Sequence, residues 1–198
     1  MRLKLFEENL SALQKFQLKL INKIVGHVPG PIAVQSYRPE WFGAPFNECV
    51  MEALRDTKAW TKAEAELFAA FVSRNNECPY CMSAHTAITS KGIKKDVVTA
   101  VLNDWKTAPI NDQIRATLGF LEKLTRTPAD VTKADLDPLY AANVSQEAIK
   151  EAIYICFVFC LINRLANAFD FEMAPEGGAN RLGFILYNAG YGLATLPG

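Results

Sequence analysis

Apolar residues recur along the chain at spacings of three and four, which places them on one face of a helix. Near the N-terminus the positions that share such a face are Leu3, Phe6, Leu10, Leu13, Leu20 and Ile24. The segment 26–31 contains two glycines and two prolines and is predicted to end this helix. A loop-rich stretch is expected to follow to about Pro45, and then a short helix from about Pro45 to Arg55.

Local end signals mark the next helices. Thr61 and Glu64 have the spacing of a capping box and open a helix that frays at 74–76. Pro79 and Gly92 bracket the following one, because helices favour proline just inside the start and glycine just beyond the end. Further helices are predicted at about 94–105, 111–126, 132–142 with a Thr132/Asp135 start, Ser145 to Phe169, and Ala179 to Tyr187.

The helix predicted from Ser145 to Phe169 has a middle that is apolar on all sides. Such a helix lies at the centre of a fold or forms part of a subunit interface. No stretch of the chain alternates over enough residues to demand a sheet, so the predicted fold class is all-α. A length of 198 residues fits one domain. We expect a helical arm over about 1–58 and a motif-bearing core over about 59–198.

Composition excludes several classes of protein. With 50% apolar residues the chain can build a core, which argues against disorder. The 21 Lys+Arg balance the 21 Asp+Glu, so no electrostatic footprint indicates nucleic acid or a lipid surface as a partner. The N-terminus has no signal-peptide core. The longest apolar run, 152–162, is shorter than the roughly 20 residues that span a bilayer. We therefore expect a soluble cytoplasmic protein with reduced thiols.

The five cysteines and two histidines gain meaning from position. With Pro79 as the first helical residue, Cys78 is the N-cap and Cys81 lies in the first turn, where the helix dipole and unpaired N–H groups stabilise a thiolate. Spacings of three, four and seven place Cys78, Cys81 and His85 on one helix face. A nucleophile, a resolving thiol and a base on one face suit reversible disulfide chemistry.

The imidazole of His85 needs an orienting partner, and the acidic candidates in the preceding helix are Glu64 and Glu66. If the two helices form an antiparallel hairpin, Glu66 and His85 lie at depths of roughly 15 and 9 Å from the turn. The irregular connection at 75–77 can partly absorb this difference. The geometry therefore allows a contact between Glu66 and His85 without requiring it.

Glu66, Cys78, Cys81 and His85 form the pattern Glu-x11-Cys-x2-Cys-x3-His, which resembles the signature of the AhpD-like and carboxymuconolactone decarboxylase superfamily. The form Asn76-x-Cys78-x-Tyr80-Cys81-x3-His85 is similar to its peroxidase-related branch. The resemblance implies an all-α AhpD-like fold, a homo-oligomer (dimer, trimer or hexamer) and thiol-dependent reduction of hydroperoxides. It also implies that Cys81 attacks the peroxide, Cys78 is its disulfide partner, and Glu66 with His85 forms a proton relay. Some AhpD proteins have a histidine where this chain has Tyr80.

The cysteine pair is open to two other interpretations. Structural zinc takes four ligands, and the motif supplies three, so a fourth has to come from Glu66, Cys49 or His27. No metal or cofactor is therefore expected. The sequence Cys-Pro-Tyr-Cys is also that of the glutaredoxin active site, but a strand would have to precede it, and here the preceding residues form a capped helix.

The remaining candidate residues have structural interpretations. Cys156 and Cys160 share a helix face among apolar neighbours and are assigned to the core. Cys49 has no base near it in sequence and is interpreted as structural, and His27 in its Gly/Pro-rich turn as a surface or helix-end residue. The pair Asn163 and Arg164 is open to either a site or an interface role.

The leading hypothesis is a thiol peroxidase or disulfide oxidoreductase whose partners are a small hydroperoxide and an external dithiol or thioredoxin-like reductant. The neutral charge of the chain fits small uncharged peroxides. One alternative is a carboxymuconolactone decarboxylase-type lyase without a cofactor, in which His85 or Glu66 is the base. The other is a non-enzymatic oligomer whose assembly responds to the Cys78–Cys81 disulfide.

Overall fold

The computed structural model describes residues 10–37, 39–175 and 177–191, and among these it contains helices and no strand. The all-α prediction is confirmed. The α-helices are α2 (Ala12–Val25), α3 (Gly30–Tyr37), α4 (Pro39–Phe42), α5 (Ala44–Leu54), α6 (Lys62–Asn75), α7 (Pro79–Thr89), α8 (Lys95–Asp104), α9 (Asp112–Arg126), α10 (Asp137–Ala141), α11 (Gln146–Phe169) and α12 (Gly178–Ala189). Two short 3-10 turns, η1 (Pro128–Asp130) and η2 (Lys133–Leu136), precede α10.

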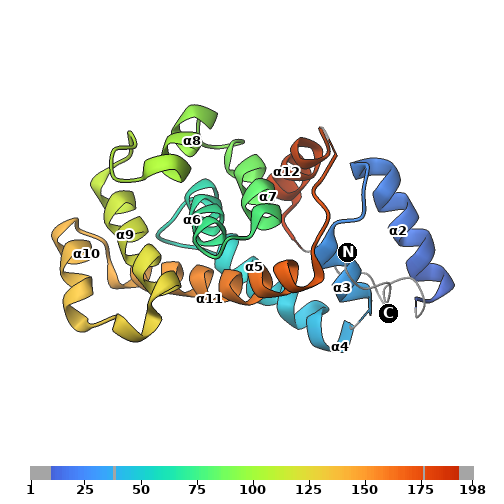
Figure 1. Cartoon of the computed structure of the whole chain (residues 1–198), viewed down its shortest axis with the longest axis horizontal. Helices are drawn as coiled ribbons and strands as arrows, with labels where there is room; N and C mark the ends of the chain where they lie inside the picture. The colour runs from blue at the N-terminus through green and yellow to red at the C-terminus, as the bar shows by residue number, and fades with distance from the viewer. Residues whose placement is uncertain (1–9, 38, 176, 192–198) are drawn as a thin grey trace.

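Helix α6 lies at the centre of the molecule (Figure 1), where α7, α9 and α11 pack around it. Its interior positions are fully buried, including Leu67, Phe68, Phe71 and Val72. Trp60 packs edge-on against Phe68 and donates from its indole nitrogen to the Ala148 carbonyl over 2.8 Å. The beginning of α6 is thereby fixed to the beginning of α11.

Helix α11 has the length and composition of a membrane span, but one of its faces packs into the core through residues such as Ile155 and Phe159. Its opposite face is exposed and carries Ile153, Tyr154, Phe157 and Leu161. The sequence offered a central buried helix or an interface helix, and α11 combines a buried face with an uncovered apolar one.

Side-chain caps set several helix starts where the sequence predicts them. Thr61 and Glu64 form the expected capping box at α6, and Thr132 and Asp135 form one at η2. Cys78 is the N-cap of α7, as predicted. The predicted helix over 132–142 is divided into η2 and α10, with Pro138 in the first turn of α10.

The prediction of a loop-rich stretch up to about Pro45 is wrong, because α3 and α4 occupy most of this segment. The prolines read as breakers, but Pro31 is the second residue of α3 and Pro39 the first of α4, positions where a missing N–H costs nothing. Gly30 is required by packing, since a Cβ there would lie 2.2 Å from the Phe171 ring. In the N-terminal helix, Leu3 and Phe6 lie outside the described residues, and Ser11 caps α2.

The buried carboxylate of Glu151 on α11 stabilises the turn before α6. It accepts hydrogen bonds from the backbone amides of Lys58, at 2.7 Å, and Ala59, at 3.2 Å. We expect Glu151→Ala to lower the free energy of unfolding in urea by about 2 kcal/mol, because charge-assisted hydrogen bonds are lost and two amides lose their acceptor. Glu147→Ala, on the exposed first turn of α11, is the control and should cost less than about 0.5 kcal/mol. Equal losses for the two variants would contradict this role.

Candidate active site

The two motif cysteines lie at the N-terminus of α7, and both are free thiols. The Cys81 backbone amide donates a hydrogen bond to Cys78 Sγ over 3.4 Å, so the first thiol caps the helix that carries the second. Glu77, immediately before them, has a φ of 53° and turns the chain sharply from α6 into α7. Both side chains are covered, with Cys78 1% and Cys81 3% exposed.

The hydrogen bonding of the pair makes the two thiols electrostatically unequal. Hydrogen bonds from the Cys81 thiol and backbone amide lower the pKa of Cys78, although burial opposes the shift. The same contact with Cys78, followed by burial, raises the pKa of Cys81. Negative charge on the reduced pair is therefore favoured on Cys78, with Cys81 retaining the proton.

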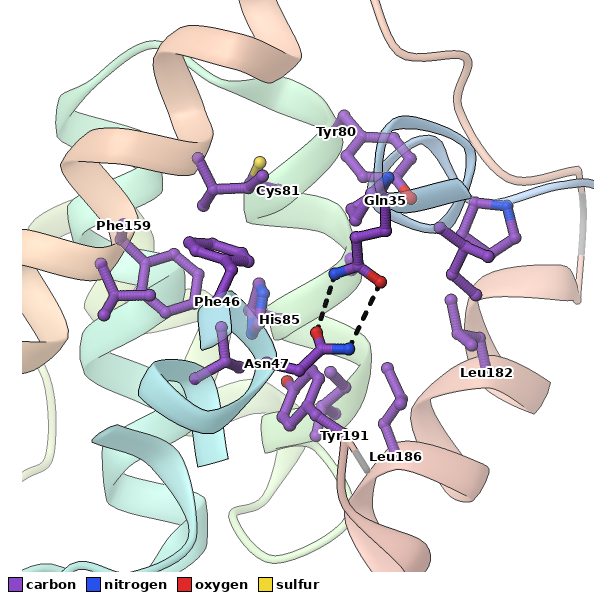
Figure 2. A pocket seen from close by; sticks show the side chains of 18 residues that line it. Gln35, Phe46, Asn47, Tyr80, Cys81, His85, Phe159, Leu182, Leu186 and Tyr191 are labelled. Carbon is purple, nitrogen blue, oxygen red and sulfur yellow. Dashed lines mark hydrogen bonds between the residues drawn. The ribbon is translucent and has the colours of Figure 1, made fainter. Parts of the chain in front are cut away.

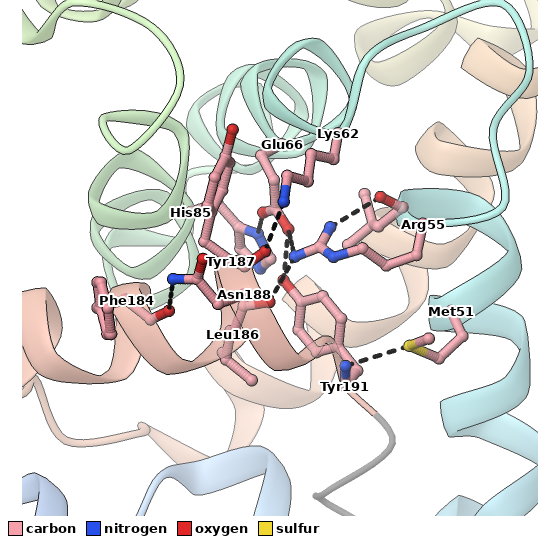
Figure 3. A network of polar contacts seen from close by, with 11 residues as sticks. Met51, Arg55, Lys62, Glu66, His85, Phe184, Leu186, Tyr187, Asn188 and Tyr191 are labelled. Carbon is pink, nitrogen blue, oxygen red and sulfur yellow. Dashed lines mark hydrogen bonds and ion pairs between the residues drawn. The ribbon is translucent and has the colours of Figure 1, made fainter.

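Glu66 and His85 meet in the structure (Figure 3), with 2.6 Å between His85 Nδ1 and Glu66 Oε2. The contact that the sequence left open is therefore made. Glu66 is fully buried on α6, and His85 packs edge-on against Phe159 with ring centroids 4.5 Å apart. The imidazole is thus held on one side by the carboxylate and on the other by an aromatic wall.

The charge state of Glu66 determines which nitrogen of His85 carries a proton. Burial raises the pKa of this carboxyl, but the charges and hydrogen bonds of His85 and Arg55 outweigh burial, so the pKa of Glu66 is lowered overall. An ionised carboxylate only accepts hydrogen bonds. His85 Nδ1 is therefore the donor, and Nε2 is left to exchange a proton with a thiol or a substrate.

Arg55 and Tyr191 complete the shell of Glu66, and sequence reasoning missed both. Arg55 Nη2 lies 2.7 Å and the Tyr191 hydroxyl 2.9 Å from Glu66 Oε1. Arg55 also donates to the Leu54 and Leu186 carbonyls, and its guanidinium lies 4.9 Å from the centre of the Tyr191 ring. Burial and the Glu66 charge raise the pKa of Tyr191, so it remains a hydroxyl donor. No spacing in the sequence links these residues to the motif.

A cavity of about 100 Å³ lies beside the thiols (Figure 2), and Cys81 and His85 form part of its wall while Cys78 does not. Most of its lining is apolar, with side chains such as Phe46, Ile88 and Phe159. Access from the cavity therefore favours Cys81, whereas hydrogen bonding favours charge on Cys78.

One wall of the cavity carries a pair of amides that the sequence did not indicate. Gln35 Nε2 donates to Asn47 Oδ1 over 2.7 Å, and Asn47 Nδ2 donates back to Gln35 Oε1 over 3.4 Å. Both side chains are buried. Because each amide occupies the other, the pair presents a polar but uncharged surface to the cavity.

Asn163 connects α11 to the thiol pair. It is fully buried, donates to the Ser73 hydroxyl over 3.1 Å and accepts from Asn76 Nδ2 over 3.0 Å. Its hydrogen bonding lowers the pKa of both motif thiols, although other contributions dominate at Cys81. Of the two residues whose role the sequence left open, Asn163 contacts the thiol pair without lining the cavity, whereas Arg164 is exposed and donates to the Cys160 carbonyl.

Cys49, Cys156 and Cys160 do not line the cavity. Cys156 is buried in the core as predicted, and Cys160 is half-buried with its Sγ 3.8 Å from that of Cys156. Cys49 is exposed on α5. Tyr80 packs edge-on against Phe171, and burial raises its pKa. Across the described ranges, no group of three or more His, Cys, Asp or Glu is arranged to hold a metal ion.

Comparisons with solved structures identify the fold. At 22% identity and a TM-score of 0.77, a peroxidase-related protein from Silicibacter sp. TM1040 matches over 91% of this chain and 95% of that chain. A second peroxidase-related protein, described as an alkylhydroperoxidase AhpD core from Ralstonia eutropha JMP134, has 26% identity, a TM-score of 0.72 and coverage of 92% and 94%. The debrominase Bmp8 has 22% identity, a TM-score of 0.69 and coverage of 87% and 95%.

No protein-family model matches the chain, and no curated protein sequence matches it. The likeness therefore rests on structure. It gives the chain the AhpD-like fold of the peroxidase-related proteins, so the resemblance inferred from four residues is confirmed at the level of the fold.

The ionised state of Glu66 should make stability depend on pH. Its pKa is lowered by folding from an ordinary value of 4.5, so the stabilisation is present above that pH and is lost as the pH falls through the folded-state value. We expect Glu66→Gln to cost about 3–5 kcal/mol at pH 7, because Arg55 is left buried without its counter-charge.

Urea unfolding of the unsubstituted protein and of Glu66→Gln between pH 7 and pH 3 measures this. The difference in their free energies of unfolding should become smaller as the pH falls. Glu64→Gln on the same helix is the matched control, since this half-buried residue keeps a capping acceptor in its amide oxygen. A penalty for Glu66→Gln that stays constant across this range would contradict an ionised Glu66.

Proposed function

Because the chain has the AhpD-like fold of the peroxidase-related proteins, we propose that it is a thiol peroxidase that reduces small organic hydroperoxides through Cys78 and Cys81. The observation that carries the proposal is the 2.6 Å contact between Glu66 and His85, on the wall of a cavity that Cys81 also lines. A nucleophile, a base and an orienting carboxylate are the groups that activated thiol chemistry requires.

The first step oxidises Cys81. His85 Nε2 takes the thiol proton, and the Cys81 thiolate attacks the terminal oxygen of the hydroperoxide. The O–O bond breaks, Cys81 becomes a sulfenic acid, and the alkoxide that leaves takes a proton from His85 to become an alcohol. Glu66 remains ionised throughout and stabilises the imidazolium that forms between the two proton transfers.

The second step uses the other thiol. The Cys81 backbone amide donates to Cys78 Sγ and favours its thiolate, which attacks the Cys81 sulfur, forms the Cys78–Cys81 disulfide and expels hydroxide, which is protonated to water. An external dithiol, or a thioredoxin-like protein that carries one, then reduces the disulfide by exchange and is itself oxidised. No cofactor or metal takes part in this cycle.

The lining of the cavity favours an apolar organic peroxide over a charged one. Aromatic and aliphatic side chains form most of the wall, and the Gln35–Asn47 pair offers dipoles without charge. A peroxide with a short hydrocarbon group would bury that group against Phe46 and Phe159 while its oxygens face Cys81. A reducing compartment keeps the resting thiols free, so we place the protein in the cytoplasm as a soluble antioxidant enzyme.

Two alternatives share the same residues. A cofactor-free lyase would use His85 or Glu66 as the base and leave the cysteines without a role, so it would retain turnover of a lactone after both cysteines are changed to serine. A redox-sensing oligomer would change size on oxidation without consuming peroxide. A variant of the debrominase Bmp8 has been solved in complex with 2,3,4-tribromopyrrole, which adds this compound to the substrates to be tested against the cavity of this chain.

Substitution of each thiol should separate the two roles. Cys81→Ser should reduce consumption of an alkyl hydroperoxide, with dithiothreitol as reductant, to the rate without protein. Cys78→Ser should be oxidised once and gain one oxygen atom by intact mass, whereas the unsubstituted protein should lose two hydrogens. Cys49→Ser, at an exposed thiol, is the control and should behave as the unsubstituted protein. Full turnover by Cys81→Ser would exclude this mechanism.

Removal of the base should change the pH profile as well as the rate. We expect His85→Asn to slow the oxidation of Cys81 by about 10²–10⁴-fold at pH 7. The raised pKa of Cys81 means that little thiolate exists at that pH without a base, so the deficit should shrink as the pH rises towards 9. Stopped-flow measurement of peroxide consumption tests this, with His27→Asn, at the other histidine, as control. A deficit independent of pH would show that His85 does not act as the base.

A further inference from the structure

Helix α2 leaves one of its faces uncovered. It is attached to the rest of the chain through a different face, on which Gln14 donates to the Ser36 carbonyl over 3.0 Å and Val25 is buried. Large apolar side chains at spacings of three and four point to solvent, and the most exposed, Phe16, is 65% exposed. These residues, here called the α2 stripe, are Leu13, Phe16, Leu20 and Ile24.

A row of positive charge runs beside the α2 stripe. Lys15, Lys19 and Lys23 follow one another at intervals of four, so they form a line along the helix next to Phe16, Leu20 and Ile24. The helix contains no acidic residue. In the part of the chain that the structure describes, these three lysines form no ion pair.

A second exposed apolar surface lies in a groove between α5 and α11. It has a volume of about 600 Å³, and Ile153, Tyr154 and Phe157 of α11 form its apolar side. These three residues belong to the exposed apolar face of α11, and the side chain of Phe157 is 65% exposed. Covering such a surface removes apolar area from water and therefore lowers the free energy.

The rim of this groove is acidic. Glu52 of α5 and Asp56, two residues after its end, line the groove, as do Glu147 and one basic residue, Lys58. Glu48 lies one turn before Glu52 on the exposed side of α5 and continues the acidic row beyond the groove. The interval of four in this row matches that of the lysines on α2, and both rows extend over roughly 12 Å at 1.5 Å per residue. Over the described ranges, Glu48, Glu52 and Asp56 form no ion pair either.

We propose that α2 of one copy of this chain occupies the α5–α11 groove of a second copy, with the lysine row facing the acidic rim. Figure 1 shows α2 at the right-hand edge of the molecule, beyond α3 and α12. Exchange of the two α2 helices about a two-fold axis makes the contact twice. The α2 stripe and the groove of one protomer are then both covered by its partner.

Helix α2 is also connected to the wall of the cavity. The chain passes from α2 through Gly26 directly to Pro29, Pro31 and Ile32, which line the cavity beside Cys81. Docking of α2 on the partner therefore holds this part of the cavity wall in place. The inference is independent of the proposed peroxidase chemistry, because its test measures assembly and not turnover.

Charge reversal tests the pairing of the two rows. The arm variant carries Lys15→Glu, Lys19→Glu and Lys23→Glu, and the groove variant carries Glu48→Lys, Glu52→Lys and Asp56→Lys. Each alone places like charges together at both contacts. In sedimentation velocity over a range of protein concentrations at low salt, each should raise the dimer dissociation constant by at least about 100-fold. The control reverses three exposed lysines elsewhere, Lys91, Lys94 and Lys95, and should leave assembly unchanged.

Mixing the arm variant with the groove variant is the decisive measurement. In the mixed dimer the reversed arm meets the reversed groove and the natural arm meets the natural groove, so dimers should form again with near-original affinity. Circular dichroism confirms that each variant is folded before the comparison. A protein that is monomeric at all concentrations, an oligomer indifferent to both variants, or a mixture that fails to restore dimers would overturn the proposal.

Discussion

The structure depends on one buried negative charge, the carboxylate of Glu66. A carboxylate without solvent needs several donors to remain ionised, and Glu66 obtains them from three separate parts of the chain: Arg55 after α5, His85 on α7 and Tyr191 after α12. The charge thereby fixes the position of these segments relative to α6. It also selects the tautomer of His85, so the interaction that joins the fold together prepares the site for proton transfer.

A single nucleophile would need both a stabilised negative charge and contact with the cavity, and here each thiol has one of these properties. Cys78 has the better stabilised charge because the Cys81 thiol and the Cys81 backbone amide donate hydrogen bonds to it, and Cys81 has contact with the cavity because it lies one turn further on. In a disulfide cycle this division is useful, since the thiol that meets the substrate and the thiol that closes the disulfide need different properties. Asn163 contributes to both thiols from α11 and links their state to the core.

Local signals predicted the motif well. Proline at the first position of α7 fixed the place of Cys78, and the helical repeat then placed Cys81 and His85 on its face. Arg55, Tyr191 and the Gln35–Asn47 pair were not predictable, because each joins the site through long-range packing that leaves no spacing in the sequence. Helices α3 and α4 were missed since prolines that begin a helix resemble prolines that end one. The two faces of α11 were indistinguishable because both are apolar, and only tertiary packing separates them.

The burial of both sulfur atoms has a kinetic consequence. In the proposed cycle a small peroxide would reach Cys81 through the cavity, but a reductant of protein size would have to bring its own thiol against a pair that is almost wholly covered. The oxidative and reductive halves of a cycle at this pair would then differ in what limits them, diffusion into a cavity for one and displacement of the covering segments for the other. Small dithiols and protein dithiols would accordingly regenerate it at rates that reflect their size more than their reduction potential.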